Sequence, residues 1–330
     1  MANANATKDT TTKTAAGAAA KSDTTVANKP DDVLPVDTAP EPAVTFAHRL
    51  EDISAAMFFG LLRRLPMPMA SDIGGALARS LGPVTGAWRT ALSNLKLAVP
   101  ETTLESRKRI TRAAFDNFGR VMAEYSQLER LWGSRWDAFI DVAGREHLQR
   151  PSRKGAIVFS GHLGNWEIIP MVLAALGSPA LIVYRAANNP LVDARIARIR
   201  NTYAAGLAPK GAEGARDIVD HLKDGGLVYM LVDQKMNTGL DVPFFGRSAM
   251  TGKAVARLAM RHNVTLIPAR CERFGRCRFR VTFEQQMYPV GSDRDEGDVR
   301  DVLADINLKI ENWVRATPGQ WLWMHRRWPK

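Results

Sequence analysis

Beyond residue 150 the chain alternates short apolar runs with amphipathic segments, and this alternation constrains the fold more than any other feature. The apolar runs are typical of buried strands, and the segments between them have helical periodicity. The predicted strands are Ala156–Ser160, Ala180–Tyr184, 227–232 and 264–270, and the predicted helices are 167–176, 190–203, 213–224, 253–262 and 299–315. Because such strands and helices are joined by right-handed crossovers, we predict an α/β fold with a mainly parallel twisted sheet flanked by helices. A strand at 278–284, after a turn at Phe274-Gly275, is expected to extend the sheet antiparallel.

Two regions with different composition precede this alternation. The first 30 residues contain nine alanines and seven threonines but no aromatic residue, and prolines occur at positions 30, 35, 40 and 42. That composition is typical of a disordered chain. Residues 46–150 carry apolar residues at three- and four-residue spacing, which predicts helices. We therefore expect a disordered polar tail at 1–45 and one domain at 46–330, divided into a helical N-terminal part (46–150) and an α/β part (151–330).

Positive charge is concentrated in the predicted domain. The chain has a formal net charge of +11, but residues 1–45 hold four lysines and six acidic residues. The other 41 basic and 28 acidic residues give the domain a net charge of +13. A basic body favours an acidic partner, such as nucleic acid, an anionic membrane, a phosphorylated substrate or an acidic protein. The two cysteines, Cys271 and Cys277, indicate a reducing compartment.

No segment has the pattern of a secretory signal or a membrane span. The N-terminus lacks the apolar core of a signal peptide. The best membrane candidate, residues 53–62, has ten residues before Arg63 and Arg64, whereas a hydrocarbon core needs about 20. This short apolar segment fits either a helix that lies on a membrane surface or an ordinary core helix.

The segment most suggestive of chemistry is Ser160-Gly161-His162-Leu163-Gly164-Asn165-Trp166-Glu167, directly after a predicted strand. On one continuous helix, His162 and Glu167 would face directions roughly 140° apart. A tight turn over the glycines and a helix starting near Asn165 would let Glu167 reach the imidazole and leave its other nitrogen free as a general base. Backbone N–H groups near Gly164 and Asn165 would stabilise an oxyanion. The spacing alone also fits a surface loop.

Several other chemistries have no motif in the chain. The sequence contains no H-E-x-x-H, no G-x-S-x-G and no G-x-G-x-x-G. The stretch from Gly246 to Lys253 resembles a phosphate loop, but it is one residue too long and continues with Ala254. We therefore expect no metal and no cofactor, and we predict that His162 activates a substrate hydroxyl directly.

Further segments occur in the order and spacing of a known family. They are Tyr184-Arg185, Asn189-Pro190-Leu191-Val192-Asp193, Asp233-Gln234, Val242-Pro243-Phe244-Phe245-Gly246, Thr251 and Gln320-Trp321-Leu322-Trp323-Met324-His325-Arg326-Arg327-Trp328. Together with the H-x4-E segment, they resemble the late, lauroyl- and myristoyl-type lipid A biosynthesis acyltransferases, a branch of the H-x4-D/E acyltransferases. The resemblance runs from about residue 50 to residue 328 and implies a glycerolipid acyltransferase-like fold.

The resemblance implies an enzyme that transfers a fatty acyl chain from acyl carrier protein to a hydroxyl of a lipid A precursor. Such a precursor is a phosphorylated, acylated glucosamine disaccharide that usually bears Kdo sugars. The reaction belongs to lipopolysaccharide biosynthesis and takes place at the cytoplasmic face of the inner membrane. Family members often begin with one membrane-spanning helix. Because the corresponding segment here is short and is followed by Arg63 and Arg64, we expect peripheral attachment through residues near 53–65 and a basic face.

The same resemblance implies roles for individual residues. His162 corresponds to the general base, Glu167 to its partner, and Arg200 and Asp233 to supporting positions. The positions expected to bind substrate are Arg185, Asn165, Gly164, Gln234, Phe244, Phe245, Thr251, Arg326 and Arg327. Each has a structural alternative: the arginines fit a solvated helix face, Asp233 fits either an arginine partner or a helix cap, and the aromatic residues fit a packed core.

Two rival functions stay open. Related sequences acylate phosphatidylinositol mannosides, so the acceptor could be a different glycolipid. A peripheral module that binds anionic lipids would also fit the positive charge. No nucleic-acid-binding motif accompanies that charge, so nucleic acid is not an expected partner.

Overall fold

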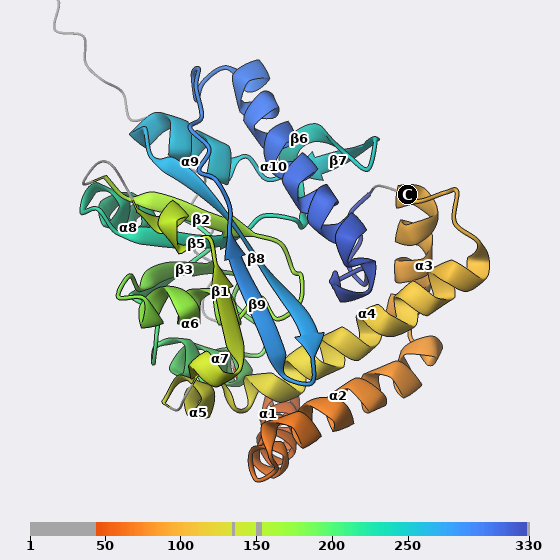
Figure 1. Cartoon of the computed structure of the whole chain (residues 1–330). Coiled ribbons are helices and arrows are strands. Elements are labelled where there is room, and N and C mark those ends of the chain that lie inside the picture. The colour runs from red at the N-terminus through yellow and green to blue at the C-terminus, as the bar shows by residue number, and fades with distance from the viewer. Residues whose placement is uncertain (1–43, 134–135, 150–153, 329–330) are drawn as a thin grey trace, which may run out of the picture. The chain divides into compact units, whose positions relative to one another are not determined.

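The computed structural model describes residues 44–133, 136–149 and 154–328, and these belong to one compact unit. The predicted tail at 1–45 lies almost entirely outside the described residues. In the described part, a seven-stranded sheet is flanked by helices, with a group of N-terminal helices beside it (Figure 1). This arrangement confirms the predicted α/β fold.

The strand order of the sheet is β1-β9-β8-β2-β5-β3-β4. The bounds are β1 (Ile140–Ala143), β2 (Ala156–Ser160), β3 (Ala180–Tyr184), β4 (Gly206–Pro209), β5 (Leu227–Leu231), β8 (Thr265–Gly275) and β9 (Arg278–Phe283). Five neighbouring strands, from β8 to β4, are parallel, and β9 returns antiparallel to β8. Strands β2 and β5 are neighbours, so the chain segments that follow them leave the sheet side by side at its carboxyl edge.

Three strand features differ from the sequence prediction. Strand β1 lies inside the region expected to be helical and pairs with β9 through only four residues at the sheet edge. The four-residue β4 begins with glycine and ends with proline, so it carries little strand signal. A separate hairpin, β6 (Lys235–Phe244) and β7 (Arg247–Thr251), turns through Phe245 and Gly246, which both have positive φ angles, of 53° and 67°.

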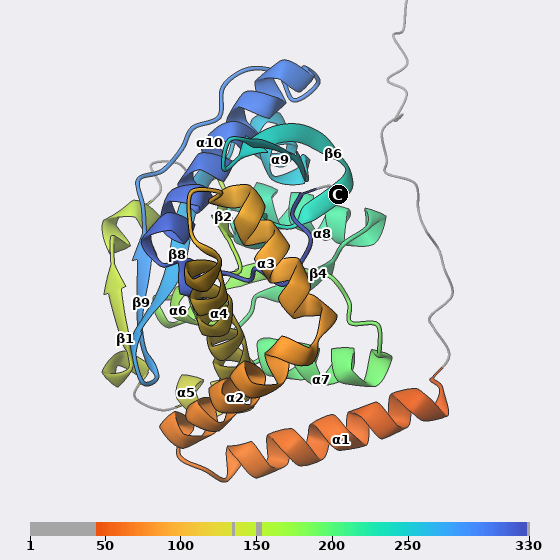
Figure 2. The same cartoon turned by 90° about the vertical axis from the view of Figure 1, so that its right-hand side faces the viewer.

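The N-terminal part of the described chain contains a series of helices. They are α1 (Phe46–Arg63), α2 (Met67–Leu81), α3 (Gly86–Ala98), α4 (Leu104–Tyr125) and the short α5 (Leu128–Trp132). The side chains of Thr45, Thr85 and Thr103 accept backbone N–H groups at the starts of α1, α3 and α4. Helices α2 and α4 pack against each other, and α1 lies beside α2 and α7 (Figure 2).

Two hydrophobic cores cover the two faces of the sheet. The remaining helices are α6 (Ile168–Ala175), α7 (Pro190–Arg200), α8 (Ala212–Lys223), α9 (Ala254–His262) and α10 (Glu296–Ala316). Ile157 and Phe159 of β2 pack in one core with residues of α8, α9 and α10. Val158 of the same strand packs in the other core with α6. Because alternate side chains of β2 are buried in both cores, the strand is held firmly, and the segment that follows Ser160 starts from a fixed point.

The C-terminal segment returns to that same edge of the sheet. Leu163 and Trp321 form an isolated antiparallel bridge, and the backbone N–H of Leu322 donates to the carbonyl of His162 at 3.0 Å. Residues more than 150 positions apart in the sequence are thereby joined beside the end of β2.

Candidate active site

His162 lies in the turn between β2 and α6 and is hydrogen-bonded to Asp233. Its Nδ1 lies 2.7 Å from Oδ1 of Asp233, and its backbone N–H donates to Oδ2 at 2.7 Å. Asp233 follows β5, the strand next to β2, so the parallel sheet brings the two residues together. Because a carboxylate only accepts hydrogen bonds, Nδ1 carries the proton and Nε2 of the neutral ring keeps its lone pair.

Asp233 is held as a buried carboxylate. Its side chain has no exposed surface, and Nε1 of Trp321 donates to Oδ2 at 2.8 Å. Burial alone would raise the pKa of Asp233, but its electrostatic interaction with His162 and the hydrogen bonds from that residue hold this pKa far below its usual value. Asp233 is therefore negatively charged at neutral pH.

Glu167 does not contact His162, contrary to the prediction. Arg200 donates from Nη2 to Oε1 at 2.5 Å and from Nε to Oε2 at 3.0 Å, so both Glu167 oxygens are engaged. Although burial opposes the charge of Arg200, the carboxylate of Glu167 raises the pKa of this guanidinium above its ordinary value. Glu167 immediately precedes α6, so this ion pair ties the start of that helix to the end of α7.

The Nε2 side of His162 faces polar and aromatic groups. Nε2 of Gln234 lies 3.4 Å from Nε2 of His162, and the Trp166 ring meets the imidazole edge-on at 5.0 Å between centroids. The His325 ring lies 6.5 Å from that of His162. Nδ1 of His325 donates to the carbonyl of Leu322 at 2.7 Å, and burial lowers the pKa of His325. His325 is thus a neutral neighbour of the catalytic candidate.

The two backbone N–H groups that were expected to form an oxyanion site are already engaged. That of Gly164 donates to the carbonyl of Gln320 at 3.0 Å, and that of Asn165 is directed to the buried thiol of Cys271. Both residues are buried. Gly164 and Asn165 therefore shape the loop rather than offer their amides to a substrate.

Gly164 has a backbone conformation that a larger residue would not tolerate. Its φ is +58°, and an added Cβ would lie 2.1 Å from the carbonyl oxygen of Cys271. We expect Gly164→Ala to lower the free energy of unfolding by about 2 kcal/mol or more, measured by urea denaturation. Gly177→Ala is a matched control, because Gly177 has φ +77° but open space around its Cβ position. Equal losses in both variants would contradict the steric argument.

A buried polar network joins the loop between β2 and α6 to helix α4. Asn165 donates from Nδ2 to Glu124 at 2.8 Å, and Glu124 also pairs with Arg273. Asn117 donates to the carbonyl of Gly164 at 2.9 Å and to that of Gln320 at 3.1 Å. Because α4 carries both Asn117 and Glu124, the N-terminal helices are part of the framework that orients the loop carrying His162.

Four residues expected to bind substrate are internal instead. Arg327 is fully buried, and its guanidinium donates to Thr251 Oγ1 at 2.7 Å and lies over the Phe244 ring. Burial lowers the pKa of Arg327 to about 10. Phe244 and Phe245 pack against Trp321, Trp323 and Trp328, which are also buried. These residues and Thr251 join the β6–β7 hairpin to the C-terminal segment. Arg185 and Arg326 remain exposed.

Sequence reasoning placed His162 correctly at the end of a strand but missed its partners. The sequence offers either an arginine or a helix cap as the partner of Asp233, and it gives no sign of the hydrogen bond from Trp321. The signal available was that Asp233 also follows a buried strand. The contact between Asp233 and His162 can be predicted only when the strand order, which places β5 beside β2, is known.

Comparison with known proteins identifies the family. A model of the bacterial lipid A biosynthesis acyltransferases matches residues 47–330. The lipid A biosynthesis palmitoleoyltransferase of Escherichia coli K12 is 27% identical over 275 residues, which cover 80% of this chain and 86% of that protein. The lipid A biosynthesis lauroyltransferase of the same strain is 24% identical, over 81% of this chain and 87% of that protein. The phosphatidylinositol mannoside acyltransferase of Mycolicibacterium smegmatis is 22% identical, over 85% of this chain and 92% of that protein. Because the family match spans the whole folded region, the chain belongs to the bacterial lipid A biosynthesis acyltransferases.

Proposed function

We propose that this acyltransferase moves a fatty acyl chain from the thioester of acyl carrier protein to a hydroxyl of a phosphorylated lipid A precursor. The observation that carries the proposal is the His162–Asp233 pair, in which a buried carboxylate binds Nδ1 of the imidazole and leaves the lone pair on Nε2, which lies 3.4 Å from Nε2 of Gln234. Relatives named for palmitoleoyl and lauroyl transfer support this acceptor class.

In the proposed mechanism, Nε2 of His162 takes the proton of the acceptor hydroxyl while its oxygen attacks the thioester carbonyl carbon. The imidazolium that forms is stabilised by the Asp233 carboxylate, which Trp321 and the loop backbone hold in place. The side-chain amide of Gln234, beside Nε2, donates to the developing oxyanion. The tetrahedral intermediate then collapses, the carbon–sulfur bond breaks and the departing thiolate takes the proton from His162. No acyl-enzyme forms.

One experiment separates this function from its rivals. The purified full chain is incubated with a tetra-acylated glucosamine disaccharide bisphosphate, with a phosphatidylinositol mannoside and with a mixture of acyl carrier thioesters. Mass spectrometry then reads which acceptor gains an acyl mass. Acylation of the mannoside alone would contradict the proposed acceptor. Binding of either lipid without thioester consumption would favour a lipid-binding module.

We also propose that α1 and α2 attach the enzyme peripherally to the cytoplasmic face of the inner membrane. No helix in the described residues is long and apolar enough to cross a bilayer. Each of the two helices nevertheless exposes a stripe of large apolar residues: Phe46, Leu50, Ile53, Met57 and Leu61 on α1, and Met69, Ile73, Leu77 and Leu81 on α2. The other side of α1 is fixed to α7 by Asp52 and Arg195, 2.9 Å apart, so the stripe faces outward.

The double variant Ile53→Glu/Met57→Glu is expected to bind vesicles at least about tenfold more weakly than the wild type. Each large apolar side chain contributes about 1.5–3 kcal/mol when it leaves water. Sedimentation with vesicles of phosphatidylethanolamine and phosphatidylglycerol measures the effect. Tyr288→Glu/Val290→Glu is the matched control, because these residues are 62% and 81% exposed elsewhere on the chain. A similar loss in the control would show that charge alone, and not the stripe, governs binding.

A further inference from the structure

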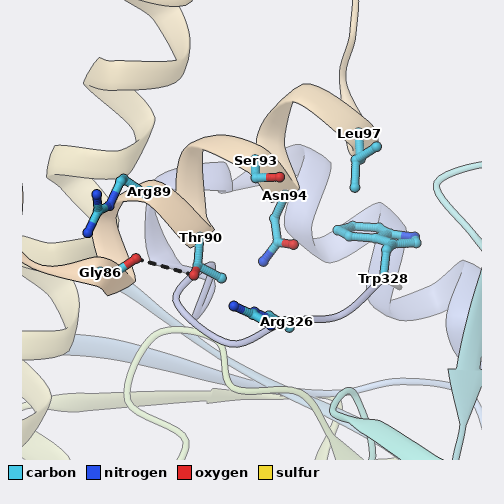
Figure 3. Close-up of a pocket in the computed structure, with 8 residues that line it drawn as sticks. All are labelled: Gly86, Arg89, Thr90, Ser93, Asn94, Leu97, Arg326 and Trp328. Carbon is cyan, nitrogen blue, oxygen red and sulfur yellow. Dashed lines mark hydrogen bonds between the residues drawn. The ribbon is translucent and has the colours of Figure 1, made fainter. Parts of the chain in front are cut away.

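A pocket of about 380 Å³ lies between α3 and the C-terminal segment. It is lined by Gly86, Arg89, Thr90, Ser93, Asn94, Leu97, Arg326 and Trp328 (Figure 3). The proposed reaction mechanism uses none of these residues. The pocket is therefore a candidate for a separate binding function.

The walls of the pocket are fixed relative to each other. Nδ2 of Asn94 donates to the carbonyls of Trp323 and His325 at 2.8 and 2.6 Å, which ties α3 to the C-terminal segment. Nε1 of Trp328 donates to the carbonyl of Phe244 at 3.2 Å, and Trp328 is 4% exposed. The shape of the pocket is thus set by buried contacts before any ligand arrives.

The lining is positively charged and has no acidic residue. Arg89 and Arg326 are exposed, and neither has a hydrogen bond or ion pair from its side chain among the described residues. The guanidinium of Arg326 points toward Thr90, and Arg89 lies beside Gly86 at the start of α3 (Figure 3). Thr90 and Ser93 add hydroxyl groups to the lining. Two unpaired guanidinium groups with hydroxyls beside them suit a phosphate or carboxylate group.

The two walls of the pocket continue along the chain into the two features that a lipid acceptor must meet. Arg326 directly follows His325, whose ring is 6.5 Å from that of His162. On its other side, α3 begins just after Leu81 and Val84, the last exposed apolar residues of the α2 region. An anionic group at headgroup level, next to the apolar stripe and close to the base, would enter this pocket.

We propose that Arg89 and Arg326 bind an anionic group, a phosphate monoester or a sugar-acid carboxylate, of the glycolipid acceptor and so place its hydroxyl near His162. This inference rests on the proposed function and deepens it, because it assigns the acceptor, and not the acyl donor, to this pocket. Phosphate also occurs in the arm of an acyl carrier protein, so the experiment has to distinguish the two sources.

The test compares wild type, Arg89→Gln/Arg326→Gln and the matched control Arg300→Gln in neutral detergent micelles. Arg300 is also exposed but lines a different pocket. The probes are the tetra-acylated glucosamine disaccharide bisphosphate and its phosphatase-treated form. Equilibrium binding of each probe is measured first, followed by KM for acceptor and for donor. Thermal unfolding confirms that all three proteins are folded.

We expect the double variant to bind the bisphosphate at least about tenfold more weakly and to raise its KM to a similar extent, with the donor KM unchanged. All three proteins should bind the phosphatase-treated probe alike. Unchanged bisphosphate binding in the double variant, or a raised donor KM instead, would overturn the inference. Binding lost in the variant while the wild type transfers no acyl chain would support the pocket and contradict the proposed function.

Discussion

Replacing His162 with alanine is expected to lower kcat for acyl transfer by about 10²- to 10⁴-fold, the range that a positioned general base contributes. The His162 side chain remains 13% exposed at the carboxyl edge of the sheet. In the variant, Asp233 keeps its hydrogen bonds from the backbone N–H of residue 162 and from Trp321, so the fold should be retained. Single-turnover transfer from an acyl carrier thioester measures the chemical step directly.

A second histidine provides the control for this variant. His147 lies on the 3-10 helix Arg145–Leu148, and its partly exposed side chain lies 3.9 Å from the carboxylate of Glu146. His147→Ala should transfer at the wild-type rate. A His162→Ala variant that retained more than about a tenth of the wild-type single-turnover rate would remove His162 as the base.

The parts of the fold that the sequence predicts well are those set by local pattern. The apolar run of β2 and the glycines after it indicate where the strand ends, and apolar residues at three- and four-residue spacing indicate the N-terminal helices. Strands β1 and β4 escape prediction because each has four residues and depends on pairing at a sheet edge. The hairpin at Phe245-Gly246 also escapes, since a phenylalanine with positive φ gives no turn signal.

The contacts of the candidate site are harder to predict because they are long-range. His162 and Glu167 are close in sequence, yet each binds a residue more than 30 positions away. Which carboxylate meets the imidazole depends on the order of β2 and β5 in the sheet, and which arginine meets Glu167 depends on the packing of α7. The position of the tryptophan-rich C-terminal segment is also hard to predict, because its mixture of aromatic and basic residues fits both a membrane interface and the buried segment that the structure contains.

Replacing Asp233 with asparagine is expected to lower kcat by about 10²- to 10⁴-fold, through the tautomer of His162. Three donors converge on the carboxylate: Nδ1–H and the backbone N–H of His162, and Nε1–H of Trp321. An asparagine amide has one acceptor oxygen and presents N–H groups to the same site. The imidazole satisfies that amide by carrying its proton on Nε2, which removes the lone pair needed for base catalysis. Single-turnover transfer measures the loss.

The pH dependence of stability gives an independent check on Asp233. Because its folded-state pKa is far below the ordinary value of 3.8, the carboxylate stabilises the fold above that pH. This contribution should decline as the pH falls below about 4 toward the folded pKa, and Asp233→Asn should lack that part of the decline. Urea unfolding of both proteins between pH 7 and pH 2 tests the sign. Parallel curves for the two proteins would contradict the assignment of a depressed pKa to Asp233.

Glu167→Gln distinguishes a partner of the base from a residue that holds the scaffold. The Glu167 and Arg200 side chains are 7% and 14% exposed, so removing the carboxylate charge leaves a buried guanidinium uncompensated. Breaking such a pair costs up to about 3–5 kcal/mol of stability, so Glu167→Gln should mainly lower the free energy of unfolding. At a temperature where both variants are folded, its transfer rate should exceed that of Asp233→Asn by at least about tenfold. Equal rates would mean that Glu167 acts on the chemistry through Arg200, and that the loop needs both carboxylates to present His162.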